Sequence, residues 1–476
     1  MTTPATTPTF AVLGAVNHGK SSVAATLAEN DQVRISSMPG ETAECQRFAL
    51  GELFVFFDTP GFQNAREALA ELRPAAQAAE PLALFAAFIE RHRGEPEFDA
   101  ECRLFQPVVE GAGLIYVVDG SRPVLDIHLA EMELLRLTGA PRLAVINPIG
   151  PDDHVAEWRR RLGQHFNAVR EFNAVQAGFA QRVELLETLA GIEQAWKPRL
   201  MQAVQVLRDE WQRRLDDSAG LIAGLLIDLL QHRETGPAPA ARHEEKDAAQ
   251  ALKQRYMDEL ATREARAHAA LIALFSHRLV KAGALPTQLF ADGLFSTPTW
   301  SLLGLSGRQL LVAGTMAGAA VGAGADAVTA GHTLLAGSMI GAAVGAASTL
   351  VLGKRRPEIA VRLPGWAGRI RLGGGGLVVG PYAARNFPWI VLDRAIGTLL
   401  AVTQRAHARR DPVTLQAEHL RELLAGSGLA SSGWDEADRA AGEKLFIRAR
   451  QGRLEAQDRA DLQALVRRHV AVMATE

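Results

Sequence analysis

Eight consecutive residues near the start of the chain have the types and spacing that phosphate binding requires. Residues 14–21 are Gly-Ala-Val-Asn-His-Gly-Lys-Ser and match the pattern G-x-x-x-x-G-K-[ST] directly after an apolar run. The glycines allow backbone N–H groups to approach phosphate oxygens, and the helix expected next turns its positive end toward them. In this pattern Lys20 contacts the β- and γ-phosphates and Ser21 is a Mg²⁺ ligand. The spacing therefore predicts a nucleoside triphosphate site.

A carboxylate follows a second apolar run. Residues 55–58, Val-Phe-Phe-Asp, continue directly into Thr-Pro-Gly at 59–61. Ligands of open α/β sheets bind at the carboxyl ends of strands. We therefore expect Asp58 to hold the Mg²⁺ shell and the backbone N–H of Gly61 to meet a γ-phosphate. Asp-Thr-Pro-Gly by itself is an ordinary turn, and its position after a phosphate loop is what gives it significance.

The elements that must position these residues follow from the hydrophobic pattern. Between residues 9 and 189 short β-rich runs alternate with longer helical patterns, which predicts an α/β P-loop domain with a mostly parallel sheet. From residue 192 the pattern becomes helical, with a break at 236–239 between two long helices, so the C-terminal half is predicted to be mainly α-helical. The predicted strands are 10–13, 47–50, 52–58, 114–119, 142–147 and 168–172.

A third motif lies between the first two. Residues 39–42, Pro-Gly-Glu-Thr, stand just before the predicted hairpin. With this motif, residues 9–180 resemble the translation-factor-related P-loop GTPases, and within them the bacterial Era- and TrmE-like group. The resemblance implies hydrolysis of GTP to GDP, with Thr42 closing over Mg²⁺ and the γ-phosphate. The roles it implies are catalysis for Lys20, Thr42 and Gly61, and Mg²⁺ binding for Ser21, Thr42 and Asp58.

Asn17 extends the resemblance. Many Era- and TrmE-like enzymes have Asn at this position of the phosphate loop, where it helps to bind a K⁺ ion that replaces an arginine finger. A cation beside the bridging oxygens stabilises charge that develops in the transition state, so the resemblance implies K⁺ activation through Asn17. The alternative is that Asn17 stabilises the loop by hydrogen bonds to nearby backbone.

Two further polar residues near the phosphate site have two interpretations each. The residue after Gly61 is Phe62 rather than the usual Gln, so the resemblance implies hydrolysis without a water-positioning glutamine. Gln63, one residue later, either orients water after a switch movement or belongs to a solvated helix start. His18 is either a neighbour of the γ-phosphate or polar surface.

The base-reading motif departs from the family pattern. The expected Asn-Lys-x-Asp is Asn-Pro-Ile-Gly at residues 147–150, so the lysine that packs on the base and the Asp that binds guanine are absent. Because matched polar groups create this kind of specificity, GTP is favoured by the resemblance alone and ATP stays open. Asp152 and Asp153 follow closely, but their spacing differs from the usual geometry. The predicted nucleotide-binding residues are Gly14, Asn17, His18, Gly19, Lys20, Ser21, Ser22 and Asn147.

The rest of the chain is expected to divide into unlike regions. Residues 62–113 are long for one switch II helix, so we predict an inserted helical piece that either transmits the nucleotide state or is a passive elaboration. The predicted regions are a P-loop GTPase domain at 1–190, a helical middle region at 191–300, a glycine-rich helical hairpin at 301–356 and a C-terminal α+β or helical region at 357–476.

The glycine-rich hairpin contains an internal repeat. Segments 313–322 and 336–345 each space their glycines four apart, which lets two helices approach closely. The predicted helices, 310–328 and 333–352, are long enough to cross a hydrocarbon layer, and basic residues flank the pair. Their Ala- and Gly-rich composition gains little from burial. The hairpin is therefore either membrane-associated or packed within a soluble helical domain, and an anchor exposed in only one nucleotide state satisfies both observations.

Composition excludes some functions and leaves others. The chain has 476 residues and a net charge of -2, which disfavours a constitutive nucleic-acid binder, and it has no direct nucleic-acid signature. Two cysteines and a start without a basic or apolar leader predict a cytoplasmic protein, at the inner membrane if the hairpin inserts. The excess of Arg over Lys and the abundance of Ala are typical of a GC-rich bacterial genome.

The leading hypothesis is a regulatory GTP-binding switch that uses GTP, Mg²⁺ and K⁺. Its expected partners are guanine nucleotide, a membrane lipid or membrane protein, and a second copy of the chain. The alternatives are a nucleotide-gated structural or membrane-remodelling protein with little turnover, and a P-loop ATPase.

Overall fold

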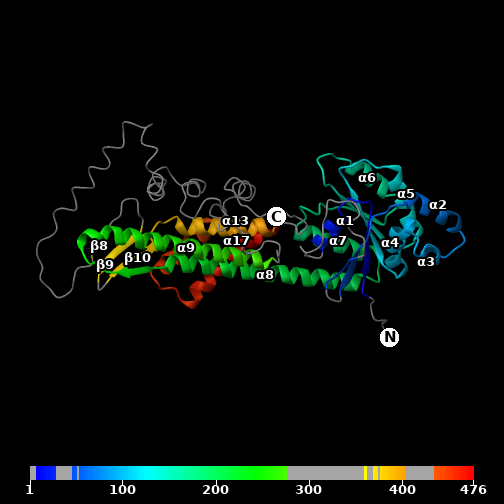
Figure 1. Ribbon diagram of the computed structural model, residues 1–476. Coiled ribbons are helices and arrows are strands. Elements are labelled where there is room, and N and C mark those ends of the chain that lie inside the picture. The colour runs from blue at the N-terminus through cyan, green and yellow to red at the C-terminus, as the bar shows by residue number, and fades with distance from the viewer. Residues whose placement is uncertain are drawn as a thin grey trace, which may run out of the picture.

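The computed structural model describes residues 7–27, 46–50, 53–275, 359–361, 368–373, 376–403 and 434–475. An α/β domain is followed by an elongated part that is mainly helical, and the long helix α8 (Lys197–Gln231) runs from one into the other (Figure 1). At about 1.5 Å per residue, the 35 residues of α8 span about 52 Å.

The N-terminal sheet has six strands among the described residues, in the order β2-β3-β1-β4-β5-β6. All neighbouring strands are parallel except β2, which pairs with β3 as one arm of an antiparallel hairpin. The predicted α/β fold with a mostly parallel sheet is therefore confirmed. The strands are β1 Thr9–Leu13, β2 Gln46–Leu50, β3 Phe54–Asp58, β4 Gly113–Asp119, β5 Arg142–Asn147 and β6 Ala168–Glu171.

Strand β1 shows why the sheet is buried on both faces. Its side chains alternate, with Phe10 and Val12 in one hydrophobic core and Ala11 and Leu13 in the other. Helices α1, α7 and the start of α8 supply the first core, and α2 to α6 supply the second. These helices are α1 Lys20–Leu27, α2 Ala65–Ala75, α3 Pro81–Arg91, α4 Asp99–Val109, α5 Asp126–Leu137, α6 Val155–Leu162 and α7 Phe179–Ile192.

The insertion predicted between residues 62 and 113 is confirmed as helical. Helices α2, α3 and α4 occupy it, with the single 3₁₀ turn η1 (Pro96–Phe98) before α4. Phe85 of α3 and Phe105 of α4 meet edge to face, with ring centroids 4.7 Å apart. The insertion therefore has aromatic packing of its own and shares the core beneath the sheet.

The C-terminal part combines long helices with a small antiparallel sheet of order β7-β10-β9-β8. Strand β7 lies where the sequence predicts only a break between two helices, because a four-residue edge strand containing Gly236 and Pro237 resembles a turn. The elements are β7 Glu234–Pro237, η2 Arg242–Glu244, α9 Glu245–Leu274, β8 Ile359–Val361, β9 Gly368–Gly373, β10 Gly376–Tyr382, α13 Phe387–Thr403, α16 Glu436–Arg450 and α17 Ala456–Thr475.

These C-terminal elements share one hydrophobic core. Residues of α8 and α9 pack with residues of α13, α16 and α17, which come more than a hundred positions later in the chain. Helix α13 is buried almost throughout, and its Arg394 pairs with Glu264 of α9 at 2.7 Å. At the start of α13, Phe387 and Trp389 are buried.

Helix α8 is anchored to the α/β domain by one large side chain. The indole of Trp196 lies against Gly113, where an added Cβ would come within 2.1 Å of the ring. Trp196 also meets Phe10 of β1 edge to face at 4.9 Å. Further along α8, Trp211 stacks on Phe179 of α7 at 4.5 Å. The helix is therefore joined to the sheet at its start and to α7 about four turns further along.

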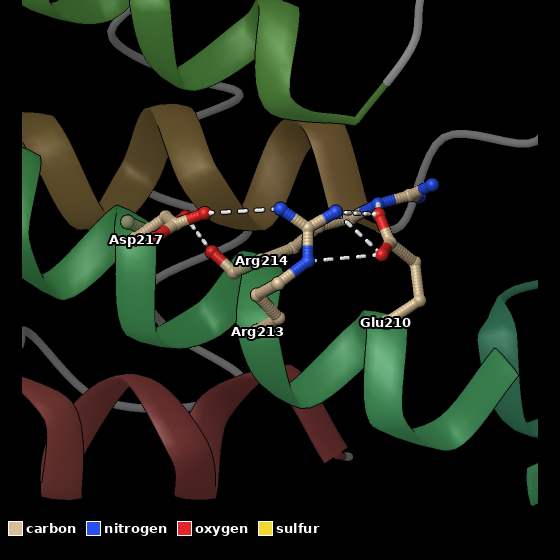
Figure 2. A network of polar contacts seen from close by, with 5 residues as sticks. Glu210, Arg213, Arg214 and Asp217 are labelled. Carbon is tan, nitrogen blue, oxygen red and sulfur yellow. Dashed lines mark hydrogen bonds and ion pairs between the residues drawn. The ribbon is translucent and has the colours of Figure 1, made fainter. Parts of the chain in front are cut away.

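Charged side chains spaced about one turn apart form a network along α8, as Figure 2 shows. Glu210 accepts from Nε of Arg213 at 3.1 Å and from Nε of Arg214 at 3.0 Å, and Arg213 also pairs with Asp217 at 3.7 Å. Each such pair adds only a few tenths of a kcal/mol to an exposed helix. The network supports helicity where α8 passes from one core to the other.

Several sequence predictions lie outside the described residues. These are Thr42 with its Pro-Gly-x-Thr motif, and the glycine-rich segment 310–353 with its repeat. Among the residues that the structure does describe, no helix combines the length and the apolar character needed to cross a membrane.

Candidate nucleotide-binding site

The phosphate loop follows β1 and leads directly into α1, as the sequence predicts. Gly14 has φ +141°, and a Cβ there would lie 2.2 Å from the carbonyl oxygen of Val117. Gly19 has φ +83°, and a Cβ there would lie 2.3 Å from Nδ2 of Asn147. Both positions therefore require glycine for space as well as for conformation. Asn17 has φ +65°, a left-handed conformation that Asn tolerates better than most residues.

Lys20 folds back over the phosphate loop. Its Nζ donates a hydrogen bond to the carbonyl oxygen of Ala15 at 3.0 Å, and the side chain is buried. Burial lowers the pKa of Lys20, while the carboxylates of Asp58 and Glu131 act in the opposite direction. The ammonium group therefore stands inside the loop, next to the backbone groups that would surround phosphates. Ser22, which is also predicted to contact the nucleotide, is half-buried at the start of α1.

Ser21 and Asp58 meet across the site. The hydroxyl of Ser21 donates to Oδ2 of Asp58 at 2.6 Å, although 37 positions separate them. Oδ1 of Asp58 is buried and has no hydrogen-bond partner among the described residues. Burial raises the pKa of Asp58, while the Ser21 hydrogen bond and the charge of Lys20 oppose that shift. A hydroxyl oxygen beside an unsatisfied carboxylate oxygen is a donor set that suits Mg²⁺.

Gly61 lies against the phosphate loop. A Cβ on Gly61 would come within 2.9 Å of the backbone N of Val16 and 3.1 Å of Nζ of Lys20. The preceding turn is fixed by Thr59, whose hydroxyl donates to the carbonyl oxygen of Val12 at 2.8 Å. The two motifs that the sequence shows far apart therefore meet at one edge of the sheet, as predicted for strand ends.

At the other end of the site, Asn147 connects two loops. Its Nδ2 donates to the carbonyl oxygen of His18 at 3.3 Å, and its Oδ1 accepts from the backbone N–H of Ala174 at 3.0 Å. Thr26 of α1 donates to the carbonyl oxygen of Ala174 at 2.9 Å, which ties the same loop to the first helix. The buried amide of Asn147 thus joins the phosphate loop to the β6–α7 loop.

The residues after Asn147 carry no base-reading side chain. Gly150 donates its N–H to the hydroxyl of Ser121 at 2.9 Å, and a Cβ on Gly150 would lie 2.9 Å from the same hydroxyl oxygen. An Asp at this position would therefore displace Ser121. Ile149 is exposed beside the loop, with half of its surface accessible.

A buried carboxylate that is not among the predicted site residues lies behind this loop. Oδ1 of Asp119 accepts from the hydroxyl of Ser121 at 2.5 Å and from the N–H of Ile149 at 3.4 Å, while Oδ2 pairs with Arg122 at 3.0 Å. Asp119 orders the β4–α5 and β5–α6 loops and is fully engaged in doing so. The sequence feature that indicates a role for Asp119 is its position at the end of strand β4, which is equivalent to the position of Asp58 at the end of β3.

His18 is buried, so the prediction that it is polar surface is wrong. Its ring lies 5.2 Å from that of His128 and 6.4 Å from that of Trp158, between the phosphate loop and helices α5 and α6. Burial, together with the charges of His128 and Lys20, lowers the pKa of His18 to about 3. The imidazole is therefore neutral at physiological pH and serves as packing beneath the loop.

The side chain of Gln63 is exposed just before α2, in agreement with a solvated helix start. Its backbone, in contrast, is held by a second carboxylate that the sequence analysis missed. Glu101 of α4 accepts from the N–H groups of Gln63 and Asn64. No local sequence pattern predicts this contact, because Glu101 and its partners are almost forty positions apart.

Comparison with known families agrees with this geometry. A family described as a domain of unknown function, DUF3482, matches residues 159–471. The chain belongs to this family. The family described as 50S ribosome-binding GTPase matches residues 9–147, the part that contains the phosphate loop, Asp58, Gly61 and Asn147. The N-terminal domain of this DUF3482 member is therefore a P-loop GTPase domain, an enzyme unit that hydrolyses GTP.

Two solved structures are similar to parts of the chain. A variant of Aquifex aeolicus Era bound to GDP and AlF4⁻ is 14% identical and covers 57% of this chain and 90% of its own, with a TM-score of 0.29. Era in complex with MgGDPNP and a segment of 16S ribosomal RNA is 12% identical with the same two coverages and a TM-score of 0.27. No curated protein shows significant similarity to the chain. The assignment of the domain thus depends on the family match and on the site.

Proposed function

We propose that the protein is a regulatory switch that binds GTP with Mg²⁺, hydrolyses it slowly and transmits the nucleotide state to its helical half. The observation that carries this proposal is the meeting of Ser21 with Asp58 at 2.6 Å, with one buried Asp58 oxygen left unsatisfied. Lys20 and Gly61 stand beside this pair. Metal-binding oxygens and γ-phosphate contacts are thereby concentrated at one end of the sheet.

The proposed roles follow from this arrangement. Ser21 and Asp58 hold the Mg²⁺ shell, and Thr42 completes it by the family resemblance. Lys20 and the N–H of Gly61 contact the γ-phosphate oxygens. Phosphoryl transfer to water depends on positioning and on stabilising developing charge rather than on a strong base. Slow turnover is therefore expected, since Phe62 replaces the usual water-positioning glutamine.

Potassium activation through Asn17 is the finer part of the proposal. Asn17 has a left-handed backbone and is exposed in the phosphate loop, which leaves it accessible to a cation. This conformation also suits the alternative, a loop stabilised by Asn17 itself. Turnover of GTP and of ATP by the purified protein, each in K⁺ and in Na⁺ buffer, separates the two. GTP-selective, K⁺-stimulated hydrolysis supports the proposal, and equal rates in both cations contradict the role of Asn17.

Transmission to the helical half is proposed to pass through α8. Trp196 packs on Gly113 at the start of β4, and the same helix enters the C-terminal core from Trp211 onward. One rigid helix therefore contacts both cores. Because both contacts are closely packed, a shift of β4 would move α8 and with it the C-terminal core.

Membrane association is proposed for the segment 310–353. The glycine repeat and the basic residues on both sides support it, and the helices of the described residues do not. Flotation of the full chain with vesicles of anionic lipid, in GDP and in GDPNP, tests it. Absence of flotation in both nucleotides favours a soluble hairpin.

A further inference from the structure

The segment that leads into α2 is held by a side chain of the inserted helix α4. Oε1 of Glu101 accepts from the backbone N–H of Gln63 at 2.7 Å and from that of Asn64 at 2.6 Å. The N-terminal N–H groups of a helix lack partners inside the helix and are usually satisfied by the side chain of the N-cap residue. Asn64 is the N-cap of α2, but its side chain donates to the carbonyl oxygen of Glu97 instead. Glu101 therefore holds the N-cap residue of α2 and the residue before it from another helix.

Helix α4 holds this segment at a second point as well. One turn after Glu101, the ring of Phe105 meets that of Phe62 edge to face at 6.3 Å. On the opposite side of the segment, Gly61 lies against Val16 and Lys20 of the phosphate loop. Residues 61–64 are thus held between the phosphate loop and α4, and the position of the Gly61 N–H is set from both sides.

The burial of Glu101 makes this arrangement costly to change. The residue is fully buried, and its Oε2 has no hydrogen-bond partner among the described residues. Its favourable contacts are therefore concentrated in the two N–H groups bound to Oε1. If residues 63 and 64 moved away, the carboxylate would lose both, and a buried charge without partners is strongly unfavourable.

We propose that Glu101 is a positioning residue for γ-phosphate recognition. It holds residues 61–64 so that the N–H of Gly61 faces the γ-phosphate, and through it the inserted helices take part in distinguishing GTP from GDP. This inference depends on the proposed function, because it assumes that Gly61 contacts the γ-phosphate.

The test compares two affinities in the full chain. Glu101→Leu keeps the approximate volume, removes the buried charge and leaves the two N–H groups without their acceptor. We expect MgGDPNP affinity and GTP turnover to fall about tenfold or more, the value of a lost charge-assisted hydrogen bond, while GDP affinity stays within about twofold. Glu101→Gln keeps one acceptor oxygen and should lose only about two- to threefold in GDPNP affinity.

The matched control is Glu80→Leu. Glu80 is likewise a glutamate of the insertion that accepts from a backbone N–H, that of Ala83 in the first turn of α3, but it is exposed. The Glu80→Leu substitution should leave the ratio of GDPNP to GDP affinity unchanged.

Two outcomes overturn the inference: an unchanged ratio of GDPNP to GDP affinity in a folded Glu101→Leu, including an equal loss of both affinities, or the same ratio change in Glu80→Leu. If Glu101→Leu does not fold, an unchanged ratio in Glu101→Gln overturns it. Failure of the proposed function looks different, because the unmodified protein would then neither prefer GDPNP nor hydrolyse GTP.

Discussion

The two ends of the nucleotide site are built differently. At the phosphate end, specific side chains and two obligatory glycines converge, and Lys20, Ser21, Asp58 and Gly61 all stand within one cluster. At the base end, the side-chain amide of Asn147 forms hydrogen bonds that join the phosphate loop to the β6–α7 loop. Gly150 occupies the place of the acidic residue that other GTPases carry. Binding energy is therefore expected to come mainly from the triphosphate, with little from the base.

The largest effect is expected from Lys20→Ala. The ammonium is the buried cation of the phosphate end, and removal of one preorganised stabiliser of transition-state charge lowers rates by about 10²-fold or more. The loss is measured as the rate of GTP turnover at saturating nucleotide. Lys197→Ala, an exposed lysine at the start of α8, is the control and should turn over GTP normally. Similar rates in Lys20→Ala and the control would show that the phosphate end is not the source of catalysis.

A smaller loss is expected from Ser21→Ala. The change removes the hydroxyl that donates to Asp58 and one oxygen of the proposed metal site, so Mg²⁺-dependent retention of nucleotide should fall about 10- to 100-fold. Dissociation of a fluorescent GDP in Mg²⁺ and after chelation with EDTA measures it. In the variant the two rates should converge. If Mg²⁺ still slows release as much as in the unmodified protein, the metal assignment of Ser21 is wrong.

Asn147→Ala tests the base end. It removes two buried hydrogen bonds that join the phosphate loop to the β6–α7 loop, and should destabilise the protein by about 1–3 kcal/mol, seen as a lower thermal midpoint. If Asn147 acts on the loops, the affinities for GTP and ATP should fall together. Asn167→Ala is the control, because Asn167 accepts from Arg142 at the opposite end of the same strand, in an exposed position. A loss confined to GTP would restore a base-reading role for Asn147.

The smallest effect is expected from a change in the base itself. Inosine triphosphate lacks the 2-amino group of guanine, which normally donates a hydrogen bond to an acidic residue. Because Gly150 offers no carboxylate, inosine triphosphate and GTP should bind within about threefold of each other. Competition for a fluorescent nucleotide measures the ratio. A preference for GTP of tenfold or more would mean that another group reads the 2-amino position, and Asp152 and Asp153 would be examined next.

The local part of the architecture was accessible from sequence. Strand β5 has the predicted bounds, and the other sheet strands begin and end within two residues of the prediction, because buried parallel strands are continuous apolar runs. Strand β7 was missed, since its pairing with β10 and not its own composition makes it a strand. The two long helices α8 and α9 were predicted on either side of it.

The sequence by itself determined the phosphate loop and the carboxylate of Asp58, because local spacing encodes a glycine turn, a helix start and a strand end. Only the tertiary structure decided the partners of Glu101, the burial of His18 and the engagement of Asp119. It also decided that α8 and α9 share one core with helices from the end of the chain. The physical reason is the same in each case: hydrogen bonding and burial of these side chains depend on elements far away in sequence, which leave no periodicity or motif at the residue itself.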